Sequence, residues 1–407
     1  MAARDPRDAV ITGIGLVSAL ADGVGDHHRL LNGNERAKPL LDTESYAPYS
    51  FHPLVEIDLG TQIPRRGDQR QMENWQRYGT YGAGLALDDA GIKGDEEVLG
   101  RTNLIVAAGG GERDPEVDST IADGIDAADN RGAFLNEHLM NDLRPTLFLA
   151  QLSNLLAGNI SLVHHVIGSS RTFMGEELGG AMALDRAHRQ IRANQGDIFL
   201  VGAANNAGRP DMLLYLALGD CLWSGADVPS VWQRSGQPGG VVSGSMAAFL
   251  VIESRAHAEA RGARIYAQLD GVIADRGSRD DAQKREKRLN RQRAFLEAKT
   301  GTAPIGVISA ASGARDAMEL ERAFLTQLSE ERPMAIRGAS TVLGHGIEAQ
   351  MPSSVALAAA ALEKGTFFPP FDDSGFEDPI PAPPDVIAVS MWGYWRGEAL
   401  AIIRAER

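Results

Sequence analysis

The chain lacks the residues that several classes of protein require. Among its 407 residues there is a single cysteine, Cys221, which excludes an intrachain disulfide framework and a metal site built from several cysteines. No apolar run approaches about 18 residues, so we expect no membrane-spanning helix. The first residues, MAARDPRDAVITG, contain no apolar targeting segment and lead directly into an expected strand, which predicts a cytoplasmic protein.

Positive charge is also scarce. Lysine and arginine number 40 against 54 acidic residues, and the net charge of −14 disfavours a nucleic acid partner. Two basic runs stand out: Arg65, Arg66 and Arg70 in IPRRGDQRQ, and QKREKRLNRQR at residues 283–293. We interpret the second run as a solvated, salt-bridged helix face. The first run is equally compatible with such a face and with a docking surface for an acidic partner.

The apolar residues fall into short runs that are typical of buried strands, and Ala- and Leu-rich helical patterns separate several of these runs. This alternation predicts an α/β protein built in layers. The Pro-rich passage Phe367–Asp385 is interpreted as a loop, because a further strand follows it. The strand-like runs are DAVITGIG, TNLIVAAGG, GDIFLVGAA, AAFLVIES, APIGVISAAS and DVIAVSMWG.

Two short motifs could suggest a metal or a nucleotide, and neither is persuasive. His164 and His165 are adjacent, so they would point to opposite faces if their segment were a strand. No second cluster of ligands accompanies them. Gly109–Gly111 form a glycine-rich turn after a strand, but the turn lacks the GxGxxG spacing of a dinucleotide site. We therefore expect neither a metal nor a cofactor.

Six segments, taken in order, resemble one enzyme family. The most informative is GSSRTFMGEELGGAMALDRA at Gly168–Ala187, where a glycine turn and a strand lead into a helix rich in small residues. The order and spacing of the segments resemble the β-ketoacyl-acyl-carrier-protein synthases, the condensing enzymes of fatty acid and polyketide synthesis. The other segments are Ala9–Leu20, Arg77–Ile92, Gly239–Leu269, the glycine–histidine pair Gly344 and His345 in GHGIEAQM, and Val386–Arg404.

The resemblance implies the thiolase fold, an α/β fold in which two similar halves pack in an αβαβα arrangement of layers. It places the N-terminal half at residues 1–255 and the C-terminal half at residues 256–407. Residues 114–147 are expected to form a helical insertion, in the region that lies near the dimer interface and the acyl channel in relatives. The resemblance also implies a buried strand ahead of the nucleophile helix.

The resemblance further implies the chemistry of the site. In this family a cysteine at a helix N-terminus carries the acyl chain as a thioester, and backbone N–H groups hold the thioester carbonyl. Two histidines stabilise the enolate formed from malonyl, and a lysine organises them. The resemblance places Glu177 on the cysteine, Ser312 on the first histidine and Ser340 on the lysine, while His345 is retained. Three replacements at one site indicate that the condensing activity is lost or altered.

The C-terminal segment resembles the Phe-Gly-Phe gating loop of the family. Trp395 and Arg396 fall on two small glycines of that loop, so we expect their side chains to crowd the space beside the nucleophile position. Phe173 and Met174 are further candidates for filling the old pocket. The five gate residues are Trp392, Gly393, Tyr394, Trp395 and Arg396.

These observations favour a non-catalytic subunit of fatty acid or polyketide elongation that resembles a chain length factor. Its expected partners are an acyl carrier protein, docking at Arg65, Arg66 and Arg70, and a catalytic ketosynthase in a heterodimer or a second copy in a homodimer. One alternative is a malonyl-carrier-protein decarboxylase, although the charge of Glu177 would repel a malonyl carboxylate. Another is a 3-oxoacyl synthase that is still active, with Cys221 as its nucleophile.

Overall fold

The computed structural model describes residues 4–145, 147, 151–225, 227–234, 239–380 and 382–406. Within these residues, ten strands form one mixed sheet in the order β10-β9-β11-β12-β8-β1-β7-β5-β3-β4, and β2 pairs with β6 separately. The strands are β1 (Ala9–Ser18), β2 (Phe51–His52), β3 (Asn103–Ala107), β4 (Ser170–Phe173), β5 (Ile198–Asn205), β6 (Ser243–Gly244), β7 (Met246–Ser254), β8 (Ala267–Arg276), β9 (Ile305–Ser309), β10 (Met334–Gly338), β11 (Val386–Trp392) and β12 (Gly397–Ala405).

The large sheet consists of two sets of five strands with the same internal order. In each set the first strand pairs antiparallel with the fifth, the fifth pairs antiparallel with the fourth, and the second lies parallel between the fourth and the third. The two sets meet only where Val10 and Ile11 of β1 pair with Gln268 and Ala267 of β8. The repeated order describes a duplicated core, and the division at residues 255 and 256 stays a prediction.

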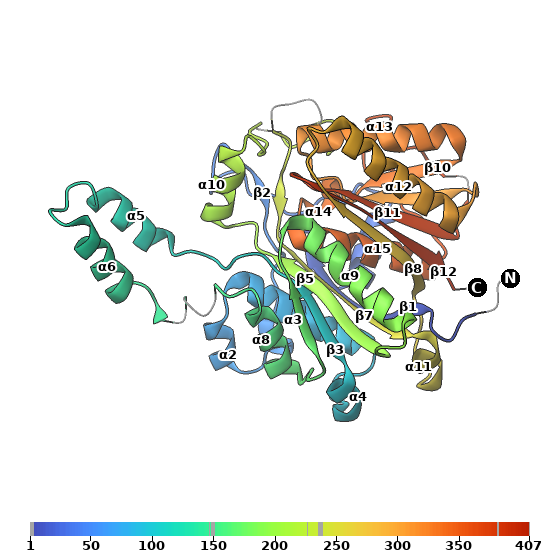
Figure 1. Ribbon diagram of the computed structural model, residues 1–407, viewed down its shortest axis with the longest axis horizontal. Helices are drawn as coiled ribbons and strands as arrows, with labels where there is room; N and C mark the ends of the chain where they lie inside the picture. Colours follow the sequence, from blue (N-terminus) through green and yellow to red (C-terminus); the bar gives the residue numbers. More distant parts are fainter. Residues whose placement is uncertain are drawn as a thin grey trace.

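Helices lie between and outside the two strand sets (Figure 1). Helices α9 and α15 contact strands of both sets, α3 and α8 contact the first set, and α12 and α13 contact the second. The predicted α/β layers are therefore confirmed. The helices are α1 (Val24–Leu31), α2 (Arg66–Gln71), α3 (Asn74–Asp89), α4 (Glu96–Arg101), α5 (Pro115–Gly124), α6 (Arg131–Asn141), α8 (Leu155–His164), α9 (Glu176–Arg192), α10 (Pro210–Leu218), α11 (Arg255–Ala260), α12 (Ala282–Thr300), α13 (Arg315–Glu331), α14 (Ser340–Leu343) and α15 (Gln350–Glu363), with single 3-10 turns η1 (Leu59–Thr61) and η2 (Ile347–Ala349).

Small residues allow the two central helices to approach closely. Every residue of α15 from Gln350 to Leu362 is buried, and Ala and Ser make up half of this helix. On α9, a side chain at Gly180 would place its Cβ 2.3 Å from the backbone oxygen of Glu348. Only glycine fits at that contact. The small-residue run that marks this segment in the sequence thus brings α9 against the turn that carries Glu348.

Two expectations about local structure need correction. The strand ahead of α9, β4, lies at the edge of the sheet, and Ser170 and Arg171 are exposed, whereas the resemblance implied a buried strand. His164 ends helix α8, and His165 follows it in a left-handed conformation with φ of 59°, so the pair does not lie on a strand. The Nε2 atom of His164 is bonded to the backbone oxygen of Thr80 at 2.8 Å, which accounts for this histidine structurally.

The basic run at residues 283–293 lies on α12 and is salt-bridged, as predicted. Arg288 Nε lies 2.9 Å from Glu398 Oε2, and both side chains are largely buried. Arg291 pairs with Asp275 at 3.0 Å. These ion pairs fasten the outer helix to β8 and β12, so this run has a structural role.

The expected insertion contains two helices, α5 and α6, that project from the body as an arm (Figure 1). We use the word arm for residues 113–144. One ion pair attaches the end of the arm to the body, between Arg144 Nη2 and Glu73 Oε1 at 2.5 Å. Of the predicted range 114–147, residue 146 lies outside the described part of the chain.

Candidate functional site

A tight turn at the start of α9 directs Glu177 into the protein. Gly175, the residue before the helix, has φ of 117°, and Glu176 has φ of 53°, a left-handed conformation that non-glycine residues seldom adopt. The turn leaves Glu176 partly exposed and buries Glu177 to 1% exposure. The helix N-terminus also favours a negative charge at this point.

The carboxylate of Glu177 joins three segments that are far apart in the sequence. Its Oε1 atom lies 2.9 Å from His345 Nε2 and accepts a hydrogen bond of 2.6 Å from the backbone N–H of Tyr394. His345 is itself 1% exposed. The structure thus brings together the residue at the cysteine position, the retained histidine and the gating loop.

Two polar atoms of this pair have no hydrogen-bond partner among the described residues. They are Oε2 of Glu177 and Nδ1 of His345, both buried. The hydrogen bond between Glu177 and His345 is therefore the contact that holds both side chains in place.

The environment of Glu177 favours its charged form. Burial pushes the pKa of this carboxyl upward, but the hydrogen bond and charge of His345, together with the backbone N–H groups of Tyr394 and Glu177, outweigh burial. The pKa of Glu177 therefore lies below its ordinary value. At neutral pH the position expected to hold a nucleophilic thiolate holds a carboxylate anion.

A second buried carboxyl group, which no sequence motif marks, belongs to the same region. Glu348 lies on η2, and burial, with a contribution from the charge of Glu177, raises its pKa to about 7. A side chain at Gly109 would place its Cβ 2.8 Å from Glu348 Oε1, so the glycine-rich turn packs directly on this carboxyl. An acidic residue inside the apolar run IEAQMPSSVALAAAA was the signal that could have identified it.

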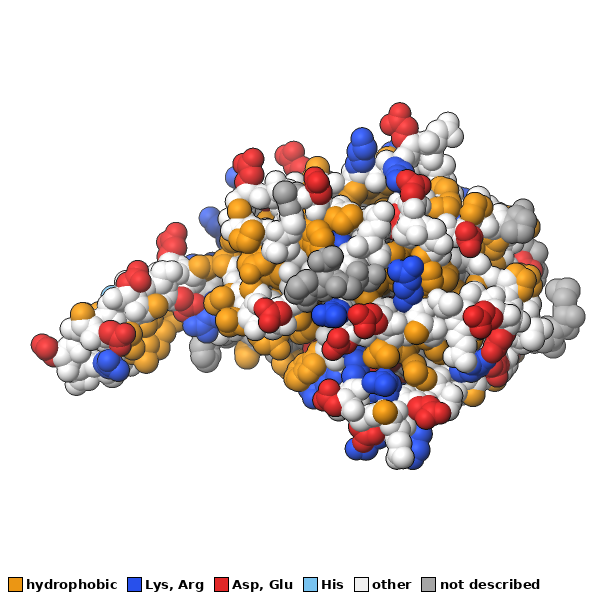
Figure 2. All heavy atoms as spheres, turned by 90° about the horizontal axis from the view of Figure 1, so that it is seen from above, with side chains coloured by type: hydrophobic (Ala, Val, Ile, Leu, Met, Phe, Trp, Pro, Cys, Tyr) orange, Lys and Arg blue, Asp and Glu red, His pale blue; other side chains and the backbone are white. Residues whose placement is uncertain are grey.

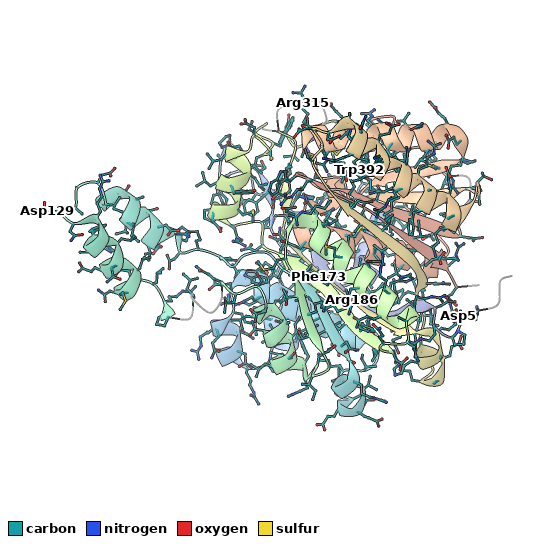
Figure 3. The ribbon with its side chains drawn as sticks, in the orientation of Figure 1. Asp5, Asp129, Phe173, Arg186, Arg315 and Trp392 are labelled. Atoms are coloured by element: carbon teal, nitrogen blue, oxygen red, sulfur yellow. The ribbon has the colours of Figure 1, made fainter. Side chains whose placement is uncertain are left out.

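The gating loop is fitted around Glu177. A side chain at Gly393 would place its Cβ 2.5 Å from Glu177 Oε2, so a larger residue there would force the Glu177 carboxylate to move. Trp392, labelled in Figure 3, is fully buried at the end of β11, and its ring lies 5.6 Å from that of Phe324. These contacts leave the backbone N–H of Tyr394 directed at the carboxylate.

The expectation that Trp395 fills the old pocket is wrong. Its side chain is 48% exposed, with the Arg396 guanidinium 3.8 Å from the ring centroid. Arg396 is half-buried beside the start of α9, where its Nη2 lies 3.8 Å from Glu176 Oε1. Met174 is 66% exposed, and Phe173 is partly buried against the core. The space beside the helix start is taken by the side chain of Glu177 itself.

Ser312 and Ser340 are buried but are not bonded to the Glu177–His345 pair. Ser312 Oγ accepts from the backbone N–H of Ala314 at 3.2 Å. Ser340 Oγ accepts from Gln350 Nε2 at 3.1 Å, and Gln350 Oε1 accepts from the Gly346 N–H at 2.7 Å. Gln350, missed in the sequence, therefore ties α14 to the loop that carries His345. Ser340 stands at the position of the family's lysine, and the hydrogen bonds there join neutral groups only.

The single cysteine is not an activated nucleophile. Cys221 follows α10 in a partly buried position, and its Sγ contacts the backbone oxygen of Gly219 at 3.3 Å. Burial, and then the charges of Glu177 and Asp220, raise the pKa of its thiol. A thiolate is the reactive form, so these surroundings oppose a catalytic role.

The remaining candidate residues lie on the surface. Arg65 precedes α2, Arg66 and Arg70 lie on it, and all three are exposed without an ion pair to any described residue. In the described ranges no group of three or more His, Cys, Asp or Glu side chains could hold a metal. None of the helices in those ranges has the length and apolar content of a membrane span.

Comparison with known proteins places this architecture in a family. The family described as "Beta-ketoacyl synthase, N-terminal domain" matches residues 7–258, so the chain belongs to the β-ketoacyl synthases. It is 26% identical to 3-oxoacyl-acyl-carrier-protein synthase 2 of Vibrio harveyi over 271 residues, which are 65% of this chain and 62% of that protein. The chain therefore matches less than two thirds of this curated relative.

Two solved structures share the fold along almost the entire chain. One is the ishigamide ketosynthase/chain length factor, 20% identical with a TM-score of 0.76, covering 98% of this chain and 100% of that chain. Another is a type II polyketide acyl-carrier protein in complex with its ketosynthase, 18% identical with a TM-score of 0.70, covering 98% and 99%. The predicted thiolase fold is confirmed by these structures, which at such identities bear on the fold alone.

The close contact at Gly393 generates a first prediction. Gly393→Ala should destabilise the protein by about 1–3 kcal/mol, because the added Cβ meets a buried carboxylate. In the double variant with Glu177→Ala the clash disappears, so the two effects should fall short of additivity by about 1 kcal/mol or more. Urea unfolding of the four proteins measures this coupling, and strictly additive effects would contradict the geometry.

The raised pKa of Glu348 generates a second prediction. The folded protein holds this proton up to about pH 7, while an unfolded chain loses it near the ordinary value of 4.5. The contribution of Glu348 to stability is therefore present below pH 4.5 and is lost as the pH rises through 7. The Glu348→Gln variant stays neutral at this position. Its free energy of unfolding should therefore rise by about 2 kcal/mol relative to that of the parent between about pH 5 and about pH 8.

The measurement is the free energy of urea unfolding of both proteins at the two pH values. Glu321 is also buried with its pKa raised to about 7, but it is present in both proteins and cancels in the difference. A difference between parent and variant that does not change with pH would show that Glu348 is charged in the folded protein.

Proposed function

We propose that this chain is a non-catalytic ketosynthase-type subunit that works beside a catalytic ketosynthase, in the manner of a chain length factor. The observation that carries the proposal is the buried Glu177 carboxylate, bonded to His345 and to the backbone N–H of Tyr394. A carboxylate that attacked a thioester would form a mixed anhydride, which is a poor store for an acyl chain. The scaffold of a condensing enzyme is present, and its nucleophile is not.

The Glu177 carboxylate also accepts hydrogen bonds from the backbone N–H groups that the carbonyl oxygen of an acyl group would need. The family resemblance assigns backbone N–H groups near the nucleophile to the thioester carbonyl oxygen. Here the N–H groups of Tyr394 and of Glu177 itself are directed at the Glu177 carboxylate. An incoming acyl oxygen would have to displace a buried anion that already holds these hydrogen bonds. This self-occupied site supports loss of acyl transfer more strongly than the residue change alone.

The same contact weighs against a malonyl decarboxylase. The enolate formed by decarboxylation is negative, and His345, the retained histidine, is already paired with a negative carboxylate. A second anion beside Glu177 would be repelled in these buried surroundings. We therefore place decarboxylation behind the subunit function. Cys221, with its raised thiol pKa, likewise gives no support to an ordinary synthase.

A non-catalytic subunit needs partners, and the surface offers a place for one of them. Arg65, Arg66 and Arg70 form an exposed basic patch without ion pairs to the described residues, on a chain whose net charge is −14. We assign this patch to an acidic acyl carrier protein. A catalytic ketosynthase of the same family would carry the growing acyl chain. This subunit would form a wall of the space that the acyl chain enters.

The test is the mass of the acyl chain on a carrier protein supplied with malonyl carrier protein and an acyl donor. Incubated alone, this protein should leave all carrier proteins unchanged, because it has no thiolate at the nucleophile position. With a catalytic ketosynthase of the same organism, its addition should change the distribution of product lengths. A β-ketoacyl product from this protein alone would contradict the proposal, as would acetyl carrier protein, which would identify a decarboxylase.

A further inference from the structure

A small cavity lies at the seam where β1 and β8 join the two strand sets. Its volume is about 100 Å³, which is large enough for a few water molecules or for one small ion. Apart from Ala9, every described residue along its wall is polar or charged. A cavity of this composition suits a polar ligand. The polar residues are Asp8 before β1, His188 and Arg192 on α9, Gln268 and Asp270 on β8, and Lys299 on α12.

The two acids of the cavity already have hydrogen-bond donors. Asp270 Oδ1 lies 3.1 Å from Lys299 Nζ, and Asp270 Oδ2 accepts a hydrogen bond of 2.9 Å from Arg404 Nη2. Asp8 Oδ1 accepts a hydrogen bond of 2.9 Å from Arg192 Nη1, and Asp8 Oδ2 accepts one of 3.1 Å from a backbone N–H. All four carboxylate oxygens are therefore engaged, and the acids do not make the cavity a cation site.

The donors of the cavity, in contrast, are in surplus. Lys299 Nζ gives two of its three N–H groups to Asp270, one to the backbone oxygen and one to Oδ1. Arg192 uses only Nη1 for its ion pairs, so its Nε and Nη2 have none with a described residue. The side chains of His188 and Gln268 make no hydrogen bond to any described residue, and each has an N–H to donate. The cavity therefore lacks an acceptor.

The charges around His188 also favour an anion. The chain as a whole is acidic, with a net charge of −14, and Figure 2 shows acidic side chains on the arm and over the body. At the His188 ring, burial and then the charges of Lys299 and Arg192 oppose protonation. Arg189 acts in the same direction and Asp270 in the opposite one, and the pKa of His188 falls to about 4. Three cations against one acid make this place attractive to a negative ligand.

We propose that the cavity binds a small oxyanion of the phosphate type, either free phosphate or the phosphate group of a monoester. The free donors come from α9, β8 and α12, so they reach an occupant from several directions. Phosphate has oxygens on all of its sides, and hydrogen bonds from charged donors to such oxygens are strong. A bound anion would connect elements of both strand sets. Glu177 lies at the other end of α9, so this inference is independent of the proposed function.

The first experiment is calorimetric titration of the full chain with inorganic phosphate at constant ionic strength and pH 7. The parent should bind phosphate saturably, and Lys299→Gln should bind about tenfold more weakly because a charged donor is lost. The matched control is Lys284→Gln, which removes the same charge from the same helix. Each lysine is paired with one aspartate, Lys299 with Asp270 and Lys284 with Asp281, and the control should bind like the parent.

The same titration with glycerol 3-phosphate separates the two sources of the ligand. Tighter binding of glycerol 3-phosphate than of free phosphate would identify a monoester, and weaker binding would identify free phosphate, and both results support the oxyanion site. No saturable binding of either compound by the parent would overturn the proposal and leave the cavity to water. Equal affinity of the parent and Lys299→Gln would overturn it as well.

The second experiment needs no folded Lys299 variant. The ring signals of the nine histidines of the parent are followed by NMR as phosphate is added at pH 7, and the His188 signal is identified by its loss in His188→Gln. An anion in the cavity should shift the His188 signal saturably, with the same dissociation constant as the calorimetry, and should leave the other histidines in place. A His188 signal that does not move, or that moves equally with sodium chloride, would overturn the proposal.

Discussion

The structure depends on one buried contact, in which a single carboxylate oxygen of Glu177 meets both His345 and the backbone N–H of Tyr394. The three residues come from the start of α9, the loop before η2 and the gating loop after β11. A buried anion is costly unless it is paired and hydrogen-bonded, and both requirements are met here. The contact therefore holds the gating loop and the nucleophile helix in one arrangement around the Glu177 carboxylate.

The surroundings of this contact are shaped to admit it. Gly393 leaves room for one carboxylate oxygen, and Gly180 lets α9 approach the turn that carries Glu348. Gln350 forms hydrogen bonds with Ser340 and Gly346, so neutral hydrogen bonds stand where the family resemblance implies a charged lysine. Together these residues surround a buried carboxylate.

The sequence predicted the α/β layers and the strands β1, β3, β5, β7, β9 and β11, and it singled out both Glu177 and His345. Glu177 and His345 could be identified because each lies in a local segment whose order resembles a family. Their mutual contact could not be derived, since it joins residues 168 positions apart. Trp395 was misplaced because its position in the sequence says nothing about the side of the loop on which it emerges. Glu348 and Gln350 were missed because polar residues within an apolar helical run carry no signal of what they contact.

The central claim is that this chain cannot hold an acyl group. The most direct test is the intact mass of the purified protein after incubation with an acyl-carrier-protein thioester, followed by peptide mapping of any adduct. We expect the parent to gain no acyl mass and Glu177→Cys to gain one acyl group at residue 177, where the Tyr394 N–H is then released. An acyl adduct on the parent chain, at Glu177 or at Cys221, would show that this chain can hold an acyl group.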